Sequence, residues 1–305
     1  MKKLLSVLLA LVMLLSVAAF AKTAKATVPK AVSYKVTDSR GVKVTFNKTP
    51  KRVISLLPSD TEIVYAFGLG KNLIAVSEYC NYPADTKNKK RLPSGSKINV
   101  ESIISLKPDV VIMGKMSQSD AQFKQLQNAG IRVIVTDANN IADTYKVIDM
   151  LGKVLKVEKK ATDIVNKMKK DFNTIKQKVK GKKAYKVYVE ISPVAYGPWT
   201  CGRGTFQDEL LNVVGAKNIF NDIKGWAQVS QEQVISRNPD LIFTTDAYSN
   251  ADPVGEIKGR ETWSGINAIK NGKVFLADGD ILSRPSPRLV DAAKELAARI
   301  YGIKF

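Results

Sequence analysis

The chain has 305 residues, of which 45% are hydrophobic, and its formal net charge is +20. This apolar content is enough for two cores of ordinary domain size. Histidine is absent. Because imidazole is the usual base of Ser and Cys nucleophile systems and the commonest transition-metal ligand, this absence argues against hydrolase triads and histidine metal sites.

Residues 1–21 have the pattern of a secretory signal peptide. Lys2 and Lys3 precede an apolar run of about 14 residues, and small residues follow at Ala19 and Ala21. The run is shorter than the roughly 20 residues that a membrane-spanning helix needs. A lipoprotein would have a cysteine directly after the cleavage site, whereas the first cysteine is Cys80. We therefore expect an exported protein on the periplasmic or extracellular face of the inner membrane, without a lipid anchor.

The first elements after this leader alternate between strands and a helix. Residues 33–46 read as a hairpin that turns at DSRG, and RVISLLPSDTEIVYAFGLGKNLIAVS follows as strand, helix and strand. Ser59 or Asp60 is a plausible N-cap for this helix, and Gly68 or Gly70 a plausible end.

The second half of the chain repeats this plan. A strand over 185–193 precedes a helix within 204–220, and ESIISLKPDVVI at 101–112 recurs as EQVISRNPDLIF at 232–243. Strands that alternate with helices indicate an α/β fold with mainly parallel sheets. We expect two Rossmann-like lobes of this kind.

A long amphipathic helix separates the two halves. Between Glu158 and Val179, apolar residues recur at spacings of three and four on an otherwise charged segment. The predicted organisation is an N-terminal α/β lobe at 22–152, a connecting spine helix at 153–182 and a C-terminal α/β lobe at 183–305.

Several segments together resemble a known family over about residues 40–303. They are RVISLLPSDTEIVYAFGLG, SEYCNYP, NVESIISLKPDVVI, GWAQVSQEQVISRNPDLI and SRPSPRLVDAAKELA. The chain is similar to the substrate-binding proteins of ABC importers that deliver cobalamin, siderophores or haem, in which one spine helix joins two α/β lobes. The likeness is greatest to the cobalamin-binding members, in the segments SEYCNYP, GPWTCGR, GWAQVSQEQ and SRPSPR.

The resemblance implies a ligand site in a cleft between the lobes. The positions that match its cleft aromatics are Tyr79 in the first lobe and Trp199 and Trp226 in the second, and Arg284 matches a cleft arginine. Such residues suit a macrocycle, because rigid rings supply apolar area while a cation reads the polar rim. Two further aromatic candidates for ligand contact are Tyr82 and Tyr248.

The repeated segments place one glutamate at equivalent positions in each half, Glu101 and Glu232. Each lies near a predicted helix start, with Asn99 as a likely N-cap and Ser230 with Gln233 as a capping box. A carboxylate in the first helical turn is favoured by about 0.3–1 kcal/mol, which alone would explain either residue. The resemblance implies a second role, docking on arginines of the importer.

Two cysteines, Cys80 and Cys201, lie next to predicted cleft aromatics. Free thiols, a disulfide across the cleft and thiolate contact to a ligand metal are all open. A disulfide requires Cα atoms within about 7 Å, which an open cleft for a macrocycle would not allow.

Other ligands and other classes of protein also remain open. At the position of a first-lobe tryptophan of the cobalamin binder this chain has Gly95, so a ferric siderophore or haem is an alternative. Four arginines would suit an anionic siderophore, and Tyr79 would be the axial ligand of haem; the arginines are Arg203, Arg260, Arg284 and Arg288.

A more distant alternative is an exported α/β enzyme with carboxylates such as Glu190 or Asp246, although no nucleophile and base pair is visible. Dispersed lysines argue against nucleic acid as a partner. The expected partners are the metal-chelate ligand and an importer permease dimer with its ATPase subunits. We expect a monomer when free, with no enzymatic activity, resident cofactor or metal.

Overall fold

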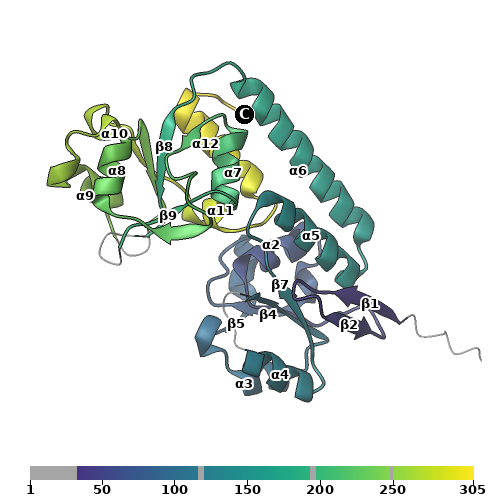
Figure 1. The fold of residues 1–305 in the computed structure, drawn as a ribbon. Helices are drawn as coiled ribbons and strands as arrows, with labels where there is room; N and C mark the ends of the chain where they lie inside the picture. The colour runs from purple at the N-terminus through teal and green to yellow at the C-terminus, as the bar shows by residue number, and fades with distance from the viewer. Residues whose placement is uncertain (1–32, 116–119, 193–196, 248–249) are drawn as a thin grey trace, which may run out of the picture. The chain divides into compact units, whose positions relative to one another are not determined.

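The computed structural model describes residues 33–115, 120–192, 197–247 and 250–305 (Figure 1). The predicted signal peptide lies outside these ranges, as does Tyr248. Within them, every helix is too short or too polar to span a bilayer.

The described chain opens with an antiparallel hairpin, β1 (Tyr34–Thr37) and β2 (Lys43–Phe46). Asp38 shapes its turn by accepting hydrogen bonds from the backbone N–H groups of Arg40 and Val42, at 2.9 and 3.1 Å. The predicted hairpin and its DSRG turn are confirmed.

The first lobe, as we use the term, is the part of the chain before α6 that carries a five-stranded parallel sheet in the order β5-β4-β3-β6-β7. Its strands are β3 (Val53–Ser55), β4 (Leu73–Ser77), β5 (Lys90–Leu92), β6 (Val110–Gly114) and β7 (Arg132–Thr136). Its helices are α2 (Pro58–Ala66), α3 (Val100–Ser105), α4 (Asp120–Asn128) and α5 (Ile141–Leu155).

The second lobe is the part after α6, and its sheet has the order β11-β9-β8-β12-β13, with β10 also paired to β8. Strands β8, β10, β12 and β13 are parallel, whereas β9 and β11 pair antiparallel. The strands are β8 (Lys186–Glu190), β9 (Trp199–Cys201), β10 (Lys217–Asn218), β11 (Trp226–Gln228), β12 (Leu241–Thr244) and β13 (Val274–Leu276). The helices are α7 (Phe206–Val213), α8 (Gln231–Arg237), α9 (Pro253–Lys258), α10 (Asn267–Lys270), α11 (Gly279–Ser283) and α12 (Leu289–Tyr301).

Both sheets are buried on both faces. In β6, Val110 and Ile112 join one hydrophobic cluster while Val111 joins another, as the alternation of side chains along a strand requires. In β8, Val187 and Tyr188 divide between two clusters in the same way. This explains why the central strands read as nearly continuous apolar runs.

Helix α6 (Glu158–Val179) runs without interruption between the two lobes in the chain (Figure 1). Its 22 residues would extend about 33 Å at 1.5 Å per residue. Its buried side chains belong to the same cluster as Val110 of the first sheet and Val187 of the second; they are Ala161, Val165, Met168, Phe172, Ile175 and Val179. The amphipathic stretch between Glu158 and Val179 is confirmed as one helix, but the predicted bounds of 153–182 are too wide, because α5 extends to Leu155 and ends at the left-handed Lys156. The boundaries proposed for the lobes stay a prediction.

Of the helix N-caps predicted from the sequence, one is wrong. The predicted N-cap of α2, Ser59 or Asp60, is wrong: the N-cap is Leu57 without a side-chain bond, and Pro58 opens the helix. Proline suits this position because its missing N–H would have no partner within the helix. Gly68, with a φ of +77°, follows the C-cap as expected of a left-handed helix end.

Candidate functional site

Polar and aromatic residues gather where the parallel strands end. Tyr79 follows β4, Thr136 ends β7, Glu190 ends β8 and Thr244 ends β12. Carboxyl ends of parallel strands lie at one edge of a sheet, and ligands of open α/β sheets bind at that edge. The predicted ligand residues are therefore expected at this edge in each lobe.

The two tryptophans predicted from the second lobe lie on one antiparallel ribbon, β9–β11. In its register, Trp199 opposes Gln228 and Trp226 opposes Cys201. Directly opposed residues of an antiparallel pair share a face, as do residues two apart on a strand. The ribbon therefore presents both indoles on the same face, as diagonal neighbours.

The two indoles differ in how much of each ring is free. Trp199 is 40% exposed. Trp226 is half-buried, donates its indole N–H to Gln207 Oε1 at 3.1 Å and packs edge-on against Phe206, with ring centroids 5.7 Å apart. Trp199 can therefore give most of a ring face to a ligand, whereas Trp226 also serves the fold.

The first-lobe candidates, Tyr79 and Tyr82, lie three positions apart and are both exposed. Tyr79 is 63% exposed and Tyr82 is 46% exposed. The guanidinium carbon of Arg288 lies 3.9 Å from the centroid of the Tyr82 ring. No interaction of Tyr248 can be described, since it lies outside the described ranges.

Three of the four candidate arginines are bound to carboxylates. Arg260 pairs with buried Glu190 at 2.8 Å, and Arg284 and Arg288 each reach Glu62 at 3.1 Å. Arg203 is exposed. An anionic ligand would therefore have to compete with protein carboxylates for every one of these guanidinium groups except that of Arg203.

Both cysteines are free thiols and almost fully buried, Cys80 at 1% exposure and Cys201 at 0%. The cross-cleft disulfide is therefore absent from this structure. Burial raises the pKa of Cys201 to about 12 and also raises the pKa of Cys80. Both groups stay protonated near neutral pH, which disfavours thiolate contact to a ligand metal.

Of the two carboxylates considered for an enzyme, Glu190 has structural partners that explain it. Glu190 accepts two hydrogen bonds from Arg260, at 2.8 and 2.9 Å, and one from the Tyr188 hydroxyl at 3.3 Å. Asp246 is 9% exposed. Across the part of the chain that the structure describes, no group of three His, Cys, Asp or Glu side chains is arranged to hold a metal ion.

The two repeated glutamates occupy the first turns of α3 and α8. Asn99 caps α3 by accepting from the Ser102 N–H at 2.9 Å, and Ser230 forms the predicted capping box with Gln233. Both carboxylates are exposed, and the Ser230 hydrogen bond lowers the pKa of Glu232. The predicted caps are confirmed, and docking stays a prediction.

A groove of about 530 Å³ adjoins Glu101. Among the described residues that line it, Glu101 is the charged one, and the others are Ile98, Asn99, Val100, Ile104, Gln122, Gln125 and Asn128. Ile104 is 37% exposed. The carboxylate therefore stands beside apolar and amide groups rather than among other charges.

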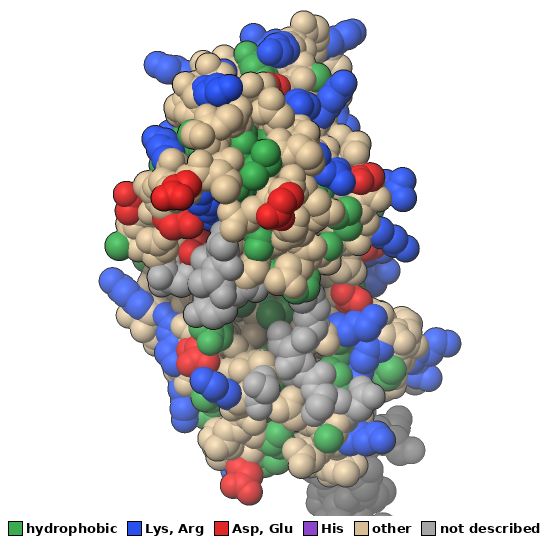
Figure 2. Space-filling model, turned by 60° about the vertical axis from the view of Figure 1, so that its left-hand side comes forward, with side chains coloured by type: hydrophobic (Ala, Val, Ile, Leu, Met, Phe, Trp, Pro, Cys, Tyr) green, Lys and Arg blue, Asp and Glu red, His purple; other side chains and the backbone are tan. Residues whose placement is uncertain are grey.

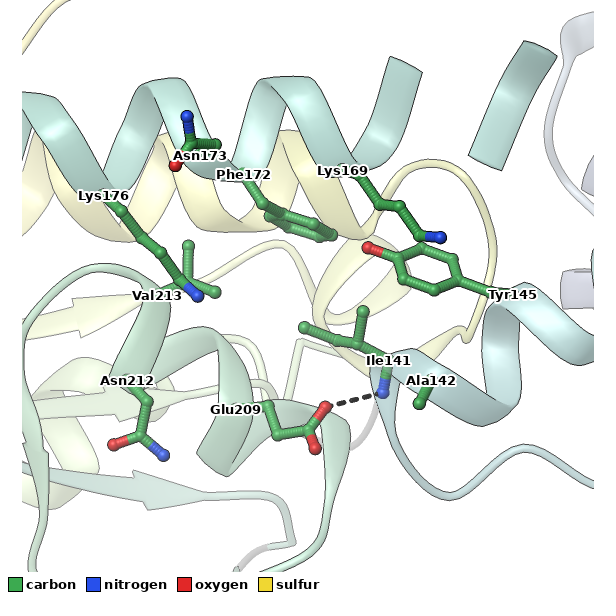
Figure 3. A pocket seen from close by; sticks show the side chains of 10 residues that line it. All are labelled: Ile141, Ala142, Tyr145, Lys169, Phe172, Asn173, Lys176, Glu209, Asn212 and Val213. Atoms are coloured by element: carbon green, nitrogen blue, oxygen red, sulfur yellow. Dashed lines mark hydrogen bonds between the residues drawn. The ribbon is translucent and has the colours of Figure 1, made fainter. Parts of the chain in front are cut away.

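A second cavity, of about 460 Å³, lies where α5, α6 and α7 meet (Figure 3). Here Glu209 of α7 accepts a hydrogen bond from the backbone N–H of Ile141, the first residue of α5, at 2.7 Å. None of the predicted ligand residues lines it. The hydrogen bond between Glu209 and Ile141 ties the two lobes together, and the cavity contributes nothing to the predicted site.

Basic side chains show no single patch on the visible face of the molecule. In Figure 2, Lys and Arg are spread over that face with Asp and Glu between them. This distribution agrees with the expectation of a dispersed positive charge.

Comparisons with known proteins agree with this architecture. Residues 53–281 match the family described as periplasmic binding protein. An uncharacterized ABC transporter substrate-binding lipoprotein of Bacillus subtilis (strain 168), YvrC, is 40% identical over 272 residues, covering 87% of this chain and 85% of the relative.

Two further relatives carry named ligands. A vitamin B12-binding protein of Yersinia pestis (strain Pestoides F) is 30% identical over 254 residues, with 83% of this chain and 87% of the relative covered. A solved structure of a possible iron-binding (periplasmic solute-binding) protein from Staphylococcus epidermidis ATCC 12228 is 36% identical, with a TM-score of 0.75 and coverage of 83% of this chain and 100% of that one. Each of these names describes a binding protein.

Proposed function

Because the chain belongs to the periplasmic binding protein family, we propose that it captures a large metal-chelate ligand and delivers it to an ABC importer. The ligand we favour is cobalamin or another corrinoid, held in a cleft between the two lobes. The protein acts after export, as a monomer when free, and performs no chemistry on its ligand. Its lack of a lipid anchor stays a prediction, since one relative is named a lipoprotein.

Exposed aromatic side chains near the strand ends carry this proposal. Large aromatic side chains are highly buried on average, yet Tyr79, Tyr82 and Trp199 keep 63%, 46% and 40% of their surface exposed. Such rings can cover the faces of a flat ligand at little cost in side-chain entropy. A B12-binding relative at 30% identity supports the corrinoid as the ligand.

A ferric siderophore or haem is the second candidate, favoured by the iron-binding relative at 36% identity. Arg203 is the exposed arginine available to an anionic chelate, and the Tyr79 side chain is exposed enough to reach a haem iron.

Calorimetry with cyanocobalamin, haemin and a ferric catecholate siderophore tests the proposal. We expect one-to-one binding of cyanocobalamin, recovery of the ligand unchanged, and at least a tenfold loss of affinity in Trp199→Ala. Phe305→Ala is the matched control, because Phe305 is also an exposed aromatic (47%) and its ring packs beside Lys178 at the C-terminus. Failure of all three ligands to bind would contradict the proposal.

Glu101 and Glu232 are, in this proposal, the contacts to the importer. They support that role because both are exposed first-turn residues of equivalent helices on a strongly basic chain. Exposed carboxylates on such a chain suit a permease surface that presents arginines.

A further inference from the structure

A buried carboxylate, Glu62 of α2, joins the two lobes. It is 4% exposed and accepts hydrogen bonds from three side chains of one second-lobe segment. Arg284 and Arg288 each donate to its Oε1 at 3.1 Å, and Ser286 donates to its Oε2 at 2.6 Å. We call these four residues the Glu62 cluster.

The same arginines also hold the first-lobe segment that carries the exposed tyrosines. Arg284 donates to Asn81 Oδ1 at 2.6 Å and to the backbone oxygen of Tyr79 at 3.4 Å. Arg288 stacks on the ring of Tyr82, with 3.9 Å between guanidinium carbon and centroid. Three of the four residues from Tyr79 to Tyr82 are therefore in contact with the second lobe.

A carboxylate of the second lobe completes the arrangement. Asp280 accepts from Arg284 at 2.6 Å and from the Asn81 amide at 2.6 Å. The guanidinium of Arg284 thus lies among acceptors from both lobes, and its side chain is 12% exposed.

Charge compensation couples Glu62 to Arg284 and Arg288. A buried carboxylate is costly unless opposite charges and hydrogen bonds compensate for its lost hydration. Glu62 obtains both from the second lobe, so the arginines are fixed by a charge that they must neutralise. Arginine suits this use because its planar, always charged fork makes several directed hydrogen bonds at once.

We propose that Arg284 and Arg288 are positioning residues: held by Glu62, they fix the segment Tyr79–Tyr82 so that its tyrosine rings face the ligand. This role rests on the proposed function for its effect on binding, but not for its effect on the segment itself. It differs from direct ligand contact by Arg284, which the family resemblance implies, because the guanidinium acts here through the tyrosines.

Hydrogen exchange of the ligand-free protein measures the positioning directly. The amides of Tyr79 and Cys80 donate to the hydroxyl and carbonyl of Ser77, so their protection reports on the segment's order. We expect Arg284→Gln/Arg288→Gln to speed their exchange at least tenfold and to weaken cyanocobalamin binding at least tenfold. Arg288→Lys, which keeps the charge over the Tyr82 ring, should retain most of the protection.

One control variant separates this role from general loss of structure. Arg237→Gln removes another arginine of the second lobe, one paired with Asp222 at 2.6 Å, and should leave exchange at Tyr79 and Cys80 unchanged. Arg91 of the first lobe also donates to the Cys80 carbonyl and remains in every variant. If the double variant does not fold, Ser286→Ala is the substitute, with a smaller change of the same sign expected.

Unchanged hydrogen exchange at Tyr79 and Cys80 in Arg284→Gln/Arg288→Gln overturns the proposal. Unchanged exchange together with lost affinity would show that the arginines contact the ligand directly. Faster exchange confined to this segment supports it. If the native protein binds none of the tested ligands, faster exchange still supports the positioning role while the proposed function fails.

Discussion

The first lobe begins α3 with the cap Asn99 and places Glu101 in the first turn, and the second lobe begins α8 with Ser230 and places Glu232 in the same turn. The lobes differ where their strands end. The sheet of the second lobe adds the antiparallel ribbon β9–β11, whereas the five-stranded sheet of the first is wholly parallel and is followed by the tyrosine segment at 79–82. Shared helix starts suit contact with a partner of repeated form, and the unshared surfaces suit one asymmetric ligand.

The largest effect we expect comes from removing both tryptophan side chains of the ribbon β9–β11, and it is an effect on ligand affinity. Trp199→Ala/Trp226→Ala should weaken cyanocobalamin binding by at least about 1000-fold, since buried aromatic anchors contribute upward of about 2 kcal/mol each, together upward of about 4 kcal/mol. The affinity of the first-lobe variant Tyr79→Ala/Tyr82→Ala, also measured by calorimetry, shows how much the tyrosine segment contributes in comparison with the ribbon. Trp226→Phe is the control for the ring packing against Phe206. If Trp199→Ala/Trp226→Ala bound cyanocobalamin with native affinity, the ribbon would not be part of the ligand site.

The buried ion pair of the second lobe should have the next largest effect. Arg260→Met leaves the Glu190 carboxylate buried without its counter-charge, so we expect about 3–5 kcal/mol less unfolding free energy in urea. Glu190→Met/Arg260→Met should recover much of that loss. Glu256→Gln removes the partly exposed partner of the same arginine (41% exposed side chain) and should cost under about 1 kcal/mol. Equal losses of unfolding free energy in Arg260→Met and Glu256→Gln would contradict the assignment of Glu190 as the partner that depends on Arg260.

A first-lobe carboxyl with no arginine partner provides the contrasting case. Burial raises the pKa of Asp60 to about 7, and the Thr136 hydroxyl donates to it at 2.8 Å. An unfolded Asp titrates near 3.9, so between about pH 4 and 7 the unfolded state loses its proton first and stability falls as pH rises. The total loss is at most about 4 kcal/mol, and the slope vanishes above pH 7.

Asp60→Asn tests this linkage. The amide oxygen can still accept from Thr136, and the group no longer titrates. Urea unfolding from pH 4 to 8 should therefore be flatter for the variant than for the native protein, with the variant gaining relative stability as pH rises. Parallel curves for the two proteins would remove Asp60 as the source of the pH dependence.

Helix capping should have the smallest effect, and a similar one in both lobes. Asn99→Ala and Ser230→Ala each remove a side-chain acceptor at a helix start, at a cost of about 1 kcal/mol in unfolding free energy. Thr205→Ala, the N-cap of α7, is a matched control outside the repeat. A loss several times larger at one glutamate-bearing helix would show that the two starts are not equivalent.

Local signals in the sequence were sufficient for several elements and for the caps of α3 and α8. The 3.6-residue pattern covers the residues of α6, although the predicted bounds of 153–182 were too wide, and the repeated segment placed α3, α8 and the strands after them. The cap of α2 was missed because Pro58 starts that helix without a side-chain acceptor. Interpretation of single helices thus succeeded where the deciding contacts lie within a few residues.

Contacts between distant segments could not be predicted. Trp199 and Trp226 share a ribbon only because β9 pairs with β11 across a long connection. Glu62 and Arg284 are 222 positions apart, and nothing in PSDTE or SRPSPR alone shows that one neutralises the other. The aromatic candidates could therefore be predicted from the sequence, whereas the β9–β11 pairing and the Glu62–Arg284 contact that position them could not.

The most direct test of the whole account is uptake by membrane vesicles that contain the cognate importer. Glu101→Lys/Glu232→Lys should bind cyanocobalamin with native affinity by calorimetry yet support no uptake of it, whereas the matched surface change Glu261→Lys should leave both intact. Native uptake with the double variant, or loss of its ligand binding, would contradict a protein that holds ligand with one set of residues and docks with another.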